Sequence, residues 1–231
     1  MAALEHVEVA GRRVSLPVEV RTAHSAAATF VVPHESASRL TAGTGLVPKR
    51  LPGGRALCIL AMVQYVDNDL GPYHEVAVSL AVGAHRGAPA GAYIHQLPVD
   101  GEFTCAAGRG IWGFPKWLAD IDLTIDDRRA HCRVVDDGEL VLELDIRSRP
   151  LPLPAKEMEM SAYAHLDGVT RRTPFTTRPT GVRGGPLGAC LVLGDRHPTA
   201  LALRSLGLPR RAAMSSVIGN LAATFGPAEP V

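Results

Sequence analysis

The 231-residue chain has neither an excess of charge of one sign nor a long apolar run, and these absences exclude two classes of protein. Its 24 basic and 23 acidic residues give a formal net charge of +1 and are scattered along the chain, so the basic surface that nucleic-acid binding requires is missing. No stretch approaches the roughly 18 consecutive apolar residues that span a bilayer. Met1–Arg13 contains Glu5 and Glu8, where a signal peptide needs positive charge and then an apolar core. We therefore expect a cytoplasmic protein that binds neither nucleic acid nor a membrane.

Cysteine is also sparse. The four cysteines stand far apart, with no Cys-x-x-Cys pair and no histidines at ligand spacing beside them. The sequence therefore predicts buried free thiols and no metal site. These residues are Cys58, Cys105, Cys132 and Cys190.

Short apolar segments, interrupted by 23 glycines and 18 prolines, are typical of a protein built mainly from strands. The clearest antiparallel neighbours are Arg55–Val66 and His74–Val82, and the best hairpin joins Arg129–Val135 to Glu139–Arg147. Further strands are expected at Val7–Ala10, Val14–Val20, Ala26–Val32, Ala92–Val99, Trp117–Ile125, Glu157–His165, Arg171–Thr177 and Gly188–Leu193. Short helices are expected at Glu35–Thr41, Asp100–Ala107 and Thr199–Leu206. We predict one domain over residues 1–231, mainly β with a few short helices (α+β), whose antiparallel sheet is closed or strongly curved because closure removes exposed edges.

The few lysines direct attention to one segment. Only Lys49, Lys116 and Lys156 are lysine among the 24 basic residues, and Lys116 lies within Trp112–Trp117, which holds both tryptophans and Phe114. An ammonium among apolar walls loses hydration, so its pKa falls and a nucleophilic amine becomes available. Such an amine condenses with a ketone to form an iminium, which withdraws electrons from a neighbouring bond. The alternative is that the lysine stem covers the tryptophans while its amine reaches solvent.

The same segment matches a dinucleotide-binding pattern at Gly108, Gly110 and Gly113. That pattern must follow a strand and open a helix, whereas Phe114, Pro115 and an alternating strand follow here. We therefore expect no nucleotide cofactor.

Three motifs in this region resemble the acetoacetate decarboxylase family. They are Gly108-Arg109 followed by aromatic residues and Phe114-Pro115-Lys116, the lead-in from Tyr93-Ile94-His95 through Val99-Asp100, and Gly71-Pro72-Tyr73-His74-Glu75-Val76. Ala37–Pro48 also fits, and the likeness spans about Phe30 to Leu123.

The resemblance implies the family's β fold, a homo-oligomer, a small keto acid as substrate and no metal or organic cofactor. It assigns the Schiff-base nucleophile to Lys116 and the acid or electrostatic role to Glu75. Acetoacetate decarboxylase is a well-known case of a lysine activated by a cationic neighbour, so this chemistry comes from the resemblance and is not deduced from the residues.

The residues around Glu75 support a pocket independently. Glu75 shares a strand face with Ala77, Ser79 and Ala81, whose small side chains leave space above a carboxylate. A solvated glutamate on a sheet edge is the other interpretation. The candidates for substrate binding are Tyr73, Cys58, Trp112, Phe114, Trp117 and Arg109.

The sequence also departs from the family at three places. Trp117 stands where the decarboxylases carry a second lysine, and Cys58 stands where they carry a second glutamate. Ser25–Ala28 occupies the region of their carboxylate-binding arginine, and Arg21, the nearest candidate, has the wrong spacing. Desolvation would therefore have to lower the pKa of Lys116 unaided. In a regular strand Lys116 would also share a polar face with Asp120, so it must lie before that strand begins.

Three functions remain open at this point. The first is a Schiff-base lyase that decarboxylates a β-keto acid, and the second is an aldolase-dehydratase that uses the same lysine on pyruvate or another 2-oxo acid. The third is a non-catalytic barrel that binds a small molecule in an apolar pocket. A nucleophilic Cys58 is a weaker idea, because no histidine is placed beside it.

Overall fold

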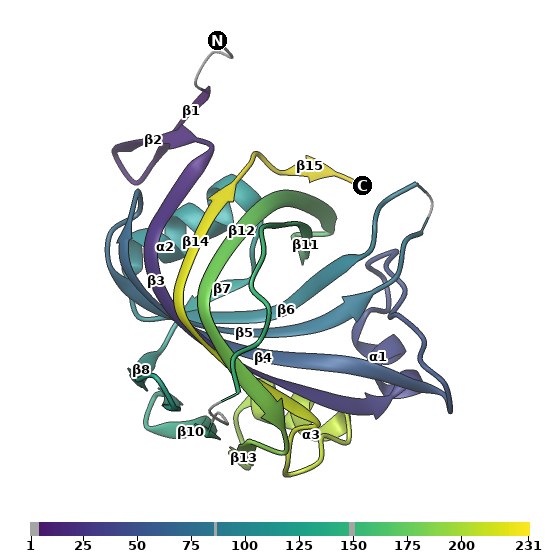
Figure 1. Cartoon of the computed structure of the whole chain (residues 1–231). Coiled ribbons are helices and arrows are strands. Elements are labelled where there is room, and N and C mark those ends of the chain that lie inside the picture. The colour runs from purple at the N-terminus through teal and green to yellow at the C-terminus, as the bar shows by residue number, and fades with distance from the viewer. Residues whose placement is uncertain (1–4, 86, 148–150) are drawn as a thin grey trace.

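The computed structural model describes residues 5–85, 87–147 and 151–231. The first four residues of the Met1–Arg13 segment lie outside these ranges. Within them the chain is mainly β, with three short α-helices and one π-helical turn, which confirms the predicted class (Figure 1). The helical segments are α1 (His34–Leu40), α2 (Glu102–Ala107), the π-helical turn η1 (Gly108–Trp112) and α3 (Pro198–Ser205). None of the helices in the described ranges has the length and apolar character that crossing a bilayer requires.

A large, strongly curved sheet forms most of the molecule (Figure 1). Its strands are β3 (Val18–Pro33), β4 (Arg55–Asn68), β5 (Tyr73–Val82), β6 (Gly91–Val99), β7 (Lys116–Leu118), β11 (Met158–Leu166), β12 (Val169–Pro186), β14 (Met214–Phe225) and β15 (Glu229–Pro230). The order is β11-β12-β14-β3-β4-β5-β6-β7, and β15 pairs with β12. Because β11 also pairs with β6, hydrogen-bonded neighbours follow one another in a ring.

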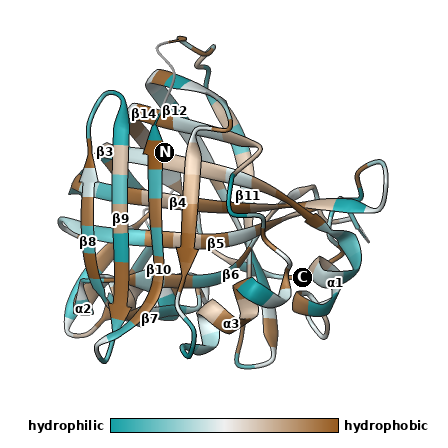
Figure 2. Ribbon diagram, turned by 90° about the horizontal axis from the view of Figure 1, so that it is seen from below, coloured by the Kyte–Doolittle hydropathy of each residue, from teal (hydrophilic) through white to brown (hydrophobic). Residues whose placement is uncertain are grey.

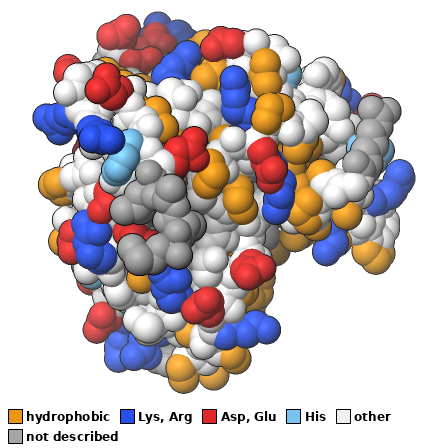
Figure 3. Space-filling view, turned by 90° about the horizontal axis from the view of Figure 1, so that it is seen from above, with side chains coloured by type: hydrophobic (Ala, Val, Ile, Leu, Met, Phe, Trp, Pro, Cys, Tyr) orange, Lys and Arg blue, Asp and Glu red, His pale blue; other side chains and the backbone are white. Residues whose placement is uncertain are grey.

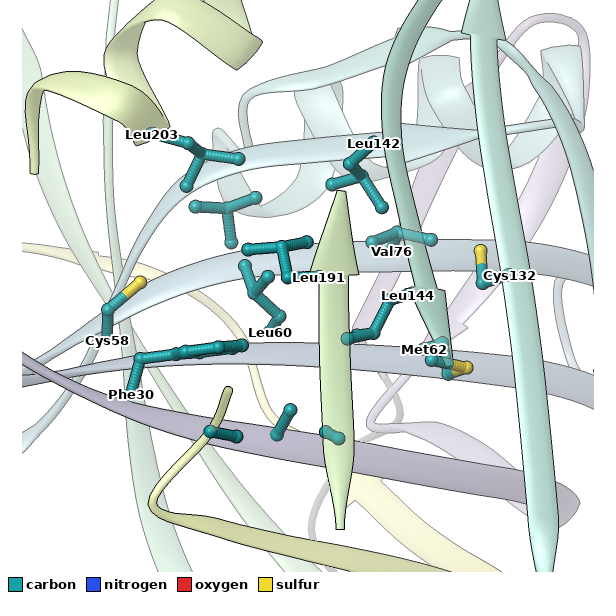
Figure 4. Packing of buried hydrophobic residues seen from close by; sticks show 14 of the residues in the cluster. Phe30, Cys58, Leu60, Met62, Val76, Cys132, Leu142, Leu144, Leu191 and Leu203 are labelled. Atoms are coloured by element: carbon teal, nitrogen blue, oxygen red, sulfur yellow. The ribbon is translucent and has the colours of Figure 1, made fainter. Parts of the chain in front are cut away.

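A four-stranded sheet of order β13-β10-β9-β8 crosses the outer face of the large sheet (Figure 2). Its strands are β8 (Asp120–Ile125), β9 (Arg129–Asp136), β10 (Glu139–Arg147) and β13 (Ala189–Leu193), while β1 (Glu5–Val9) and β2 (Arg12–Leu16) form a separate hairpin. The main apolar core lies between the two sheets, where Phe30 and Leu60 pack near Leu142, Leu144 and Leu191 (Figure 4). The large sheet is thus buried on its outer face, which leaves its inner face for a site.

The two-residue period of strands divides these faces. On β4, Leu60 and Met62 belong to the core between the sheets, whereas Ala61 and Val63 point to the inside of the curve. The antiparallel pairing of β4 with β5 continues the division, because Ala61 pairs with Ala77. The predicted pairing of these two strands is confirmed.

The structure corrects three expectations. The strand predicted at Trp117–Ile125 is divided, because β7 belongs to the large sheet and β8 to the small one. The large sheet is not wholly antiparallel, since β6 pairs in parallel with both β7 and β11. Strand β14 was not predicted, because Gly219 and Asn220 have low strand propensity and the pairing with β12 and β3 supplies its order.

Surface charge agrees with the composition. On the face shown in Figure 3, basic and acidic side chains are interspersed rather than gathered by sign. That face offers no basic patch to a polyanion.

Candidate active site

The inside of the large sheet encloses a cavity of about 210 Å³. Residues from β3, β4, β5, β6, β7, β11, β12 and β14 line it, together with Trp112 of η1 and the following Phe114. Most of the lining side chains are aliphatic or aromatic. The polar ones are Ser25, Tyr65, Asn68, Tyr73, Glu75, Ser79, Lys116 and Thr177.

The turn before β7 aims Lys116 into this cavity. Gly113 closes η1 with a positive φ of 67°, which glycine adopts without strain, and Lys116 then begins the strand by pairing with Leu97. Gly108 leaves the space that the lysine stem occupies, because a β-carbon at position 108 would overlap with it. Arg109 donates a hydrogen bond to the backbone carbonyl of Lys116 at 3.1 Å. The lysine therefore lies ahead of the regular β8 strand, as its burial requires.

Lys116 and Glu75 form a buried ion pair. The Lys116 Nζ atom lies 2.8 Å from Glu75 Oε2, and the two side chains are only 2% and 10% exposed. The same amine donates hydrogen bonds to Thr104 Oγ1 at 3.0 Å and to the Tyr73 hydroxyl at 3.4 Å. The interpretation in which the amine reaches solvent is therefore wrong.

A tyrosine holds the other oxygen of the carboxylate. The Tyr65 hydroxyl donates to Glu75 Oε1 at 3.2 Å, and its ring stacks on Tyr73 with 4.3 Å between ring centroids. Burial, reinforced by the negative charge of Glu75, raises the pKa of Tyr65 well above its ordinary value. Tyr65 therefore stays protonated and acts as a donor, so Glu75 is bound from both sides.

The charge state of Lys116 differs from the sequence expectation. Burial acts to lower the pKa of the ammonium, but the charge of Glu75 and the hydrogen bonds to Glu75 and Tyr73 raise it, and the net pKa lies above the ordinary value. The expectation that desolvation alone sets the pKa of Lys116 is therefore wrong, because the neighbouring carboxylate outweighs it. The site holds a charged amine whose proton faces a carboxylate.

The model of the family described as acetoacetate decarboxylase (ADC) matches residues 13–180. The chain belongs to the acetoacetate decarboxylase family. Comparison with curated proteins gives no match.

Solved structures share the fold of this acetoacetate decarboxylase family member. An acetoacetate decarboxylase from Legionella pneumophila subsp. pneumophila str. Philadelphia 1 is 18% identical with a TM-score of 0.71, and the alignment covers 100% of this chain and 92% of that one. The enduracididine biosynthesis enzyme MppR complexed with pyruvate is 15% identical with a TM-score of 0.70, covering 93% and 90%. An acetoacetate decarboxylase-like enzyme from Sphingomonas wittichii RW1 is 15% identical with a TM-score of 0.64, covering 100% of both chains. At these identities the likeness shows the fold.

Within this acetoacetate decarboxylase fold, four of the residues selected from the sequence line the cavity with Lys116 and three do not. Glu75, Tyr73, Trp112 and Phe114 line it. The expectation that Cys58, Trp117 and Arg109 contact substrate is not supported, because none of the three is in the wall.

Each of these three side chains has another environment. Cys58 is fully buried in the core between the sheets, on the opposite face of β4 (Figure 4), and burial raises the pKa of its thiol to about 12, which disfavours the nucleophilic thiolate. Trp117 follows Lys116 on a strand and points the other way, where its Nε1 donates to Gln96 Oε1 at 3.0 Å. Arg109 is exposed and contacts the Lys116 backbone rather than the cavity.

Two members of the polar network were not selected from the sequence. Tyr65 could have been identified from the sequence, because the predicted antiparallel pairing of β4 with β5 places it opposite Tyr73. Thr104 lies in the middle of α2, and no feature of the sequence indicated its role. Only the packing of α2 against β7 brings its hydroxyl to the Lys116 amine.

The region where these decarboxylases carry an arginine contributes no cation. Ser25 lines the cavity there, and Arg21 is exposed and paired with Asp67 and Asp69 at 2.8 and 2.7 Å. Among the described residues that line the cavity, Lys116 is the only basic one.

Proposed function

We propose that this protein is a lyase that forms a Schiff base between Lys116 and the ketone of a β-keto acid and then releases carbon dioxide. The observation that supports this most is the buried amine of Lys116, 2.8 Å from the Glu75 carboxylate inside an apolar cavity. Families that use a lysine in this way need an amine that is dry and has a proton acceptor within reach.

The first step is a proton transfer from Lys116 to Glu75. The pair is neutral overall before and after the transfer, so the transfer leaves no unpaired charge in the apolar cavity. The raised pKa of Lys116 makes the ion pair the resting state, and transfer of its proton to Glu75 supplies the neutral amine without a cationic neighbour. Tyr65 and Thr104 keep the two groups in line through their hydrogen bonds.

The neutral amine then attacks the ketone carbon to give a carbinolamine. Glu75 returns its proton to the hydroxyl, water leaves and the iminium forms. The bond from the neighbouring carbon to the carboxylate breaks, its electron pair moves into the iminium, and carbon dioxide leaves an enamine. Glu75 takes up the one proton that the overall reaction consumes and delivers it to the enamine carbon. Water then hydrolyses the iminium to ketone and ammonium.

We also propose that the ring of strand pairings through β6 and β11 acts as a closed barrel. Closure would keep bulk water from the iminium, whose early hydrolysis would compete with the release of carbon dioxide. The pairings of β11 with both β12 and β6 support this view.

An aldolase-dehydratase acting on pyruvate or another 2-oxo acid is the second candidate. The same enamine would attack an aldehyde and the product would lose water. It is favoured by the likeness to a structure described as complexed with pyruvate and by the lack of an arginine in the described part of the cavity wall.

Borohydride reduction tests the shared intermediate. The protein is incubated with acetoacetate or pyruvate, reduced and analysed by mass spectrometry, and we expect a stable adduct on the peptide that contains Lys116. Lys116→Arg should abolish the adduct, whereas Lys49→Arg, at an exposed lysine, should not. Carbon dioxide release then separates decarboxylation from aldol chemistry. Ligand binding without an adduct would instead favour the non-catalytic barrel.

A further inference from the structure

We infer that the substrate is a β-keto monocarboxylic acid with an apolar group larger than methyl on the far side of its ketone, such as a benzyl or branched alkyl group. This inference rests on the proposed function and names the substrate class of the same site. It comes from four properties of the cavity: its aromatic wall, its size, the hydrogen bonds of its uncharged polar groups, and its charges.

The aromatic side chains of this protein gather around the cavity. The chain has two tryptophans, four tyrosines and five phenylalanines, and six of these residues line it. Four of them form a continuous series: ring centroids of Trp112 lie 5.5 Å from Phe114 and 5.9 Å from Phe225, which stacks on Phe175 at 5.1 Å. Segments far apart in sequence supply these rings, so the fold assembles an apolar subsite that extends beyond the Lys116–Glu75 pair.

The volume of the cavity exceeds what a small keto acid fills. A cavity of roughly 150 Å³ lined by Leu, Ile and Phe holds a benzene ring, and this cavity measures about 210 Å³. Acetoacetate presents only a methyl group beyond its ketone. It would leave the aromatic wall without contacts and lose the dispersion energy that a larger apolar group gains there.

Three of the polar side chains in the wall, which also includes Thr177, already hydrogen-bond to the backbone. Ser25 Oγ donates to the Met62 carbonyl at 3.1 Å, and Ser79 Oγ donates to the Ile59 carbonyl at 3.3 Å. Asn68 donates to the Gly71 carbonyl at 2.6 Å and accepts from the Leu70 amide at 2.8 Å. These contacts leave Ser25, Ser79 and Asn68 poorly placed to receive a polar substituent on the substrate.

The charges in the cavity disfavour a substrate with two carboxylates. After condensation the wall holds the iminium on Lys116 and the Glu75 carboxylate beside it, and the one carboxylate of a β-keto acid is tolerated because it leaves as neutral carbon dioxide. A second carboxylate would be buried without a cation, which is costly. Dicarboxylic keto acids are therefore disfavoured, whereas an apolar group is favoured.

A substrate series tests the inference. Carbon dioxide release is measured for acetoacetate, 3-oxo-4-phenylbutanoate, 3-oxo-5-methylhexanoate and 3-oxoglutarate, with spontaneous decarboxylation subtracted. We expect kcat/KM for the phenyl and branched acids to exceed that for acetoacetate by about tenfold or more, as a group filling a hydrophobic pocket does, and 3-oxoglutarate to be the poorest substrate. A preference for acetoacetate or 3-oxoglutarate, with borohydride still labelling Lys116, would overturn the inference and leave the proposed function intact. No label and no release with any of the acids would overturn the proposed function itself.

A variant pair locates the subsite. Ala223 lines the cavity on β14, whereas Ala222 lies on the opposite face of the same strand. Ala223→Leu should lower kcat/KM for the phenyl acid more than for acetoacetate, and Ala222→Leu should keep the wild-type ratio. An unchanged ratio in a folded Ala223→Leu protein would count against this wall as the subsite.

Discussion

Gly108 packs directly against the side chain of Lys116: a β-carbon at position 108 would lie 2.6 Å from the lysine Cε, closer than such atoms approach. Glycine is therefore required here by the space that the lysine stem fills, and not by a special backbone angle, since φ is −61°. The glycine that matches a nucleotide-binding pattern in the sequence thus positions the amine.

Gly108→Ala should move the amine away from Glu75 and lower turnover by about 10²-fold, the effect of a displacement of about 1 Å at a reacting group. The control is Gly110→Ala, because a β-carbon at Gly110 meets nothing within 4 Å. Turnover and circular dichroism of both variants check the prediction. Equal activity in the two folded variants would show that the contact with Lys116 is unimportant.

Glu75→Gln should separate two effects of the carboxylate. Turnover should fall by roughly 10²–10⁴-fold, because the proton acceptor is lost. Burial would then act without the opposing charge, so the pKa of Lys116 should move down from its raised value and borohydride trapping should begin at lower pH than in the wild type. The pH profile of trapping measures this shift. A profile that moves to higher pH would contradict the account of the ion pair.

Tyr65→Phe should remove the hydrogen bond to Glu75 Oε1 and leave the cavity shape unchanged. The free energy of unfolding should fall by about 1 kcal/mol. Because the Glu75 carboxylate would lose one of its hydrogen-bond donors and be less well positioned, kcat should fall with little change in KM. Tyr163→Phe is the matched control, since its hydroxyl donates to the Pro89 carbonyl at 2.6 Å outside the cavity wall. That variant should lose stability without losing kcat. Loss of kcat in both variants would point to a general structural effect.

Trp117→Lys restores a lysine next to Lys116, as in the decarboxylases that this sequence resembles. Because residue 117 points to the other face of β7, toward Gln96 and His197, the new ammonium should not lower the pKa of Lys116. We expect the pH profile of trapping to stay as in the wild type while the melting temperature falls through loss of the tryptophan packing. A trapping profile shifted to lower pH would show that a cation at this position does reach the site.

The local strand pattern was accessible from the sequence because it depends on neighbours along the chain. The period of two on β5 placed Glu75 on a face of small residues, and the structure puts Glu75, Ala77 and Ser79 of that face in the cavity wall. The divided strand at Trp117–Ile125 was missed, because a change of sheet alters hydrogen-bond partners without altering the alternation of side chains.

The sequence by itself determined that this chain is mainly β and that one lysine stands among its scarce aromatic residues, since composition and local periodicity carry both facts. Only the tertiary structure decided which candidates share a cavity: it joined Lys116 to Glu75, Tyr65 and Thr104, and it turned Cys58, Trp117 and Arg109 away. It also decided the charge of the amine. Burial lowers the pKa of Lys116, and the Glu75 carboxylate, which lies on another strand, raises it. Both effects depend on tertiary packing, so the spacing of residues along the chain could not predict the net charge.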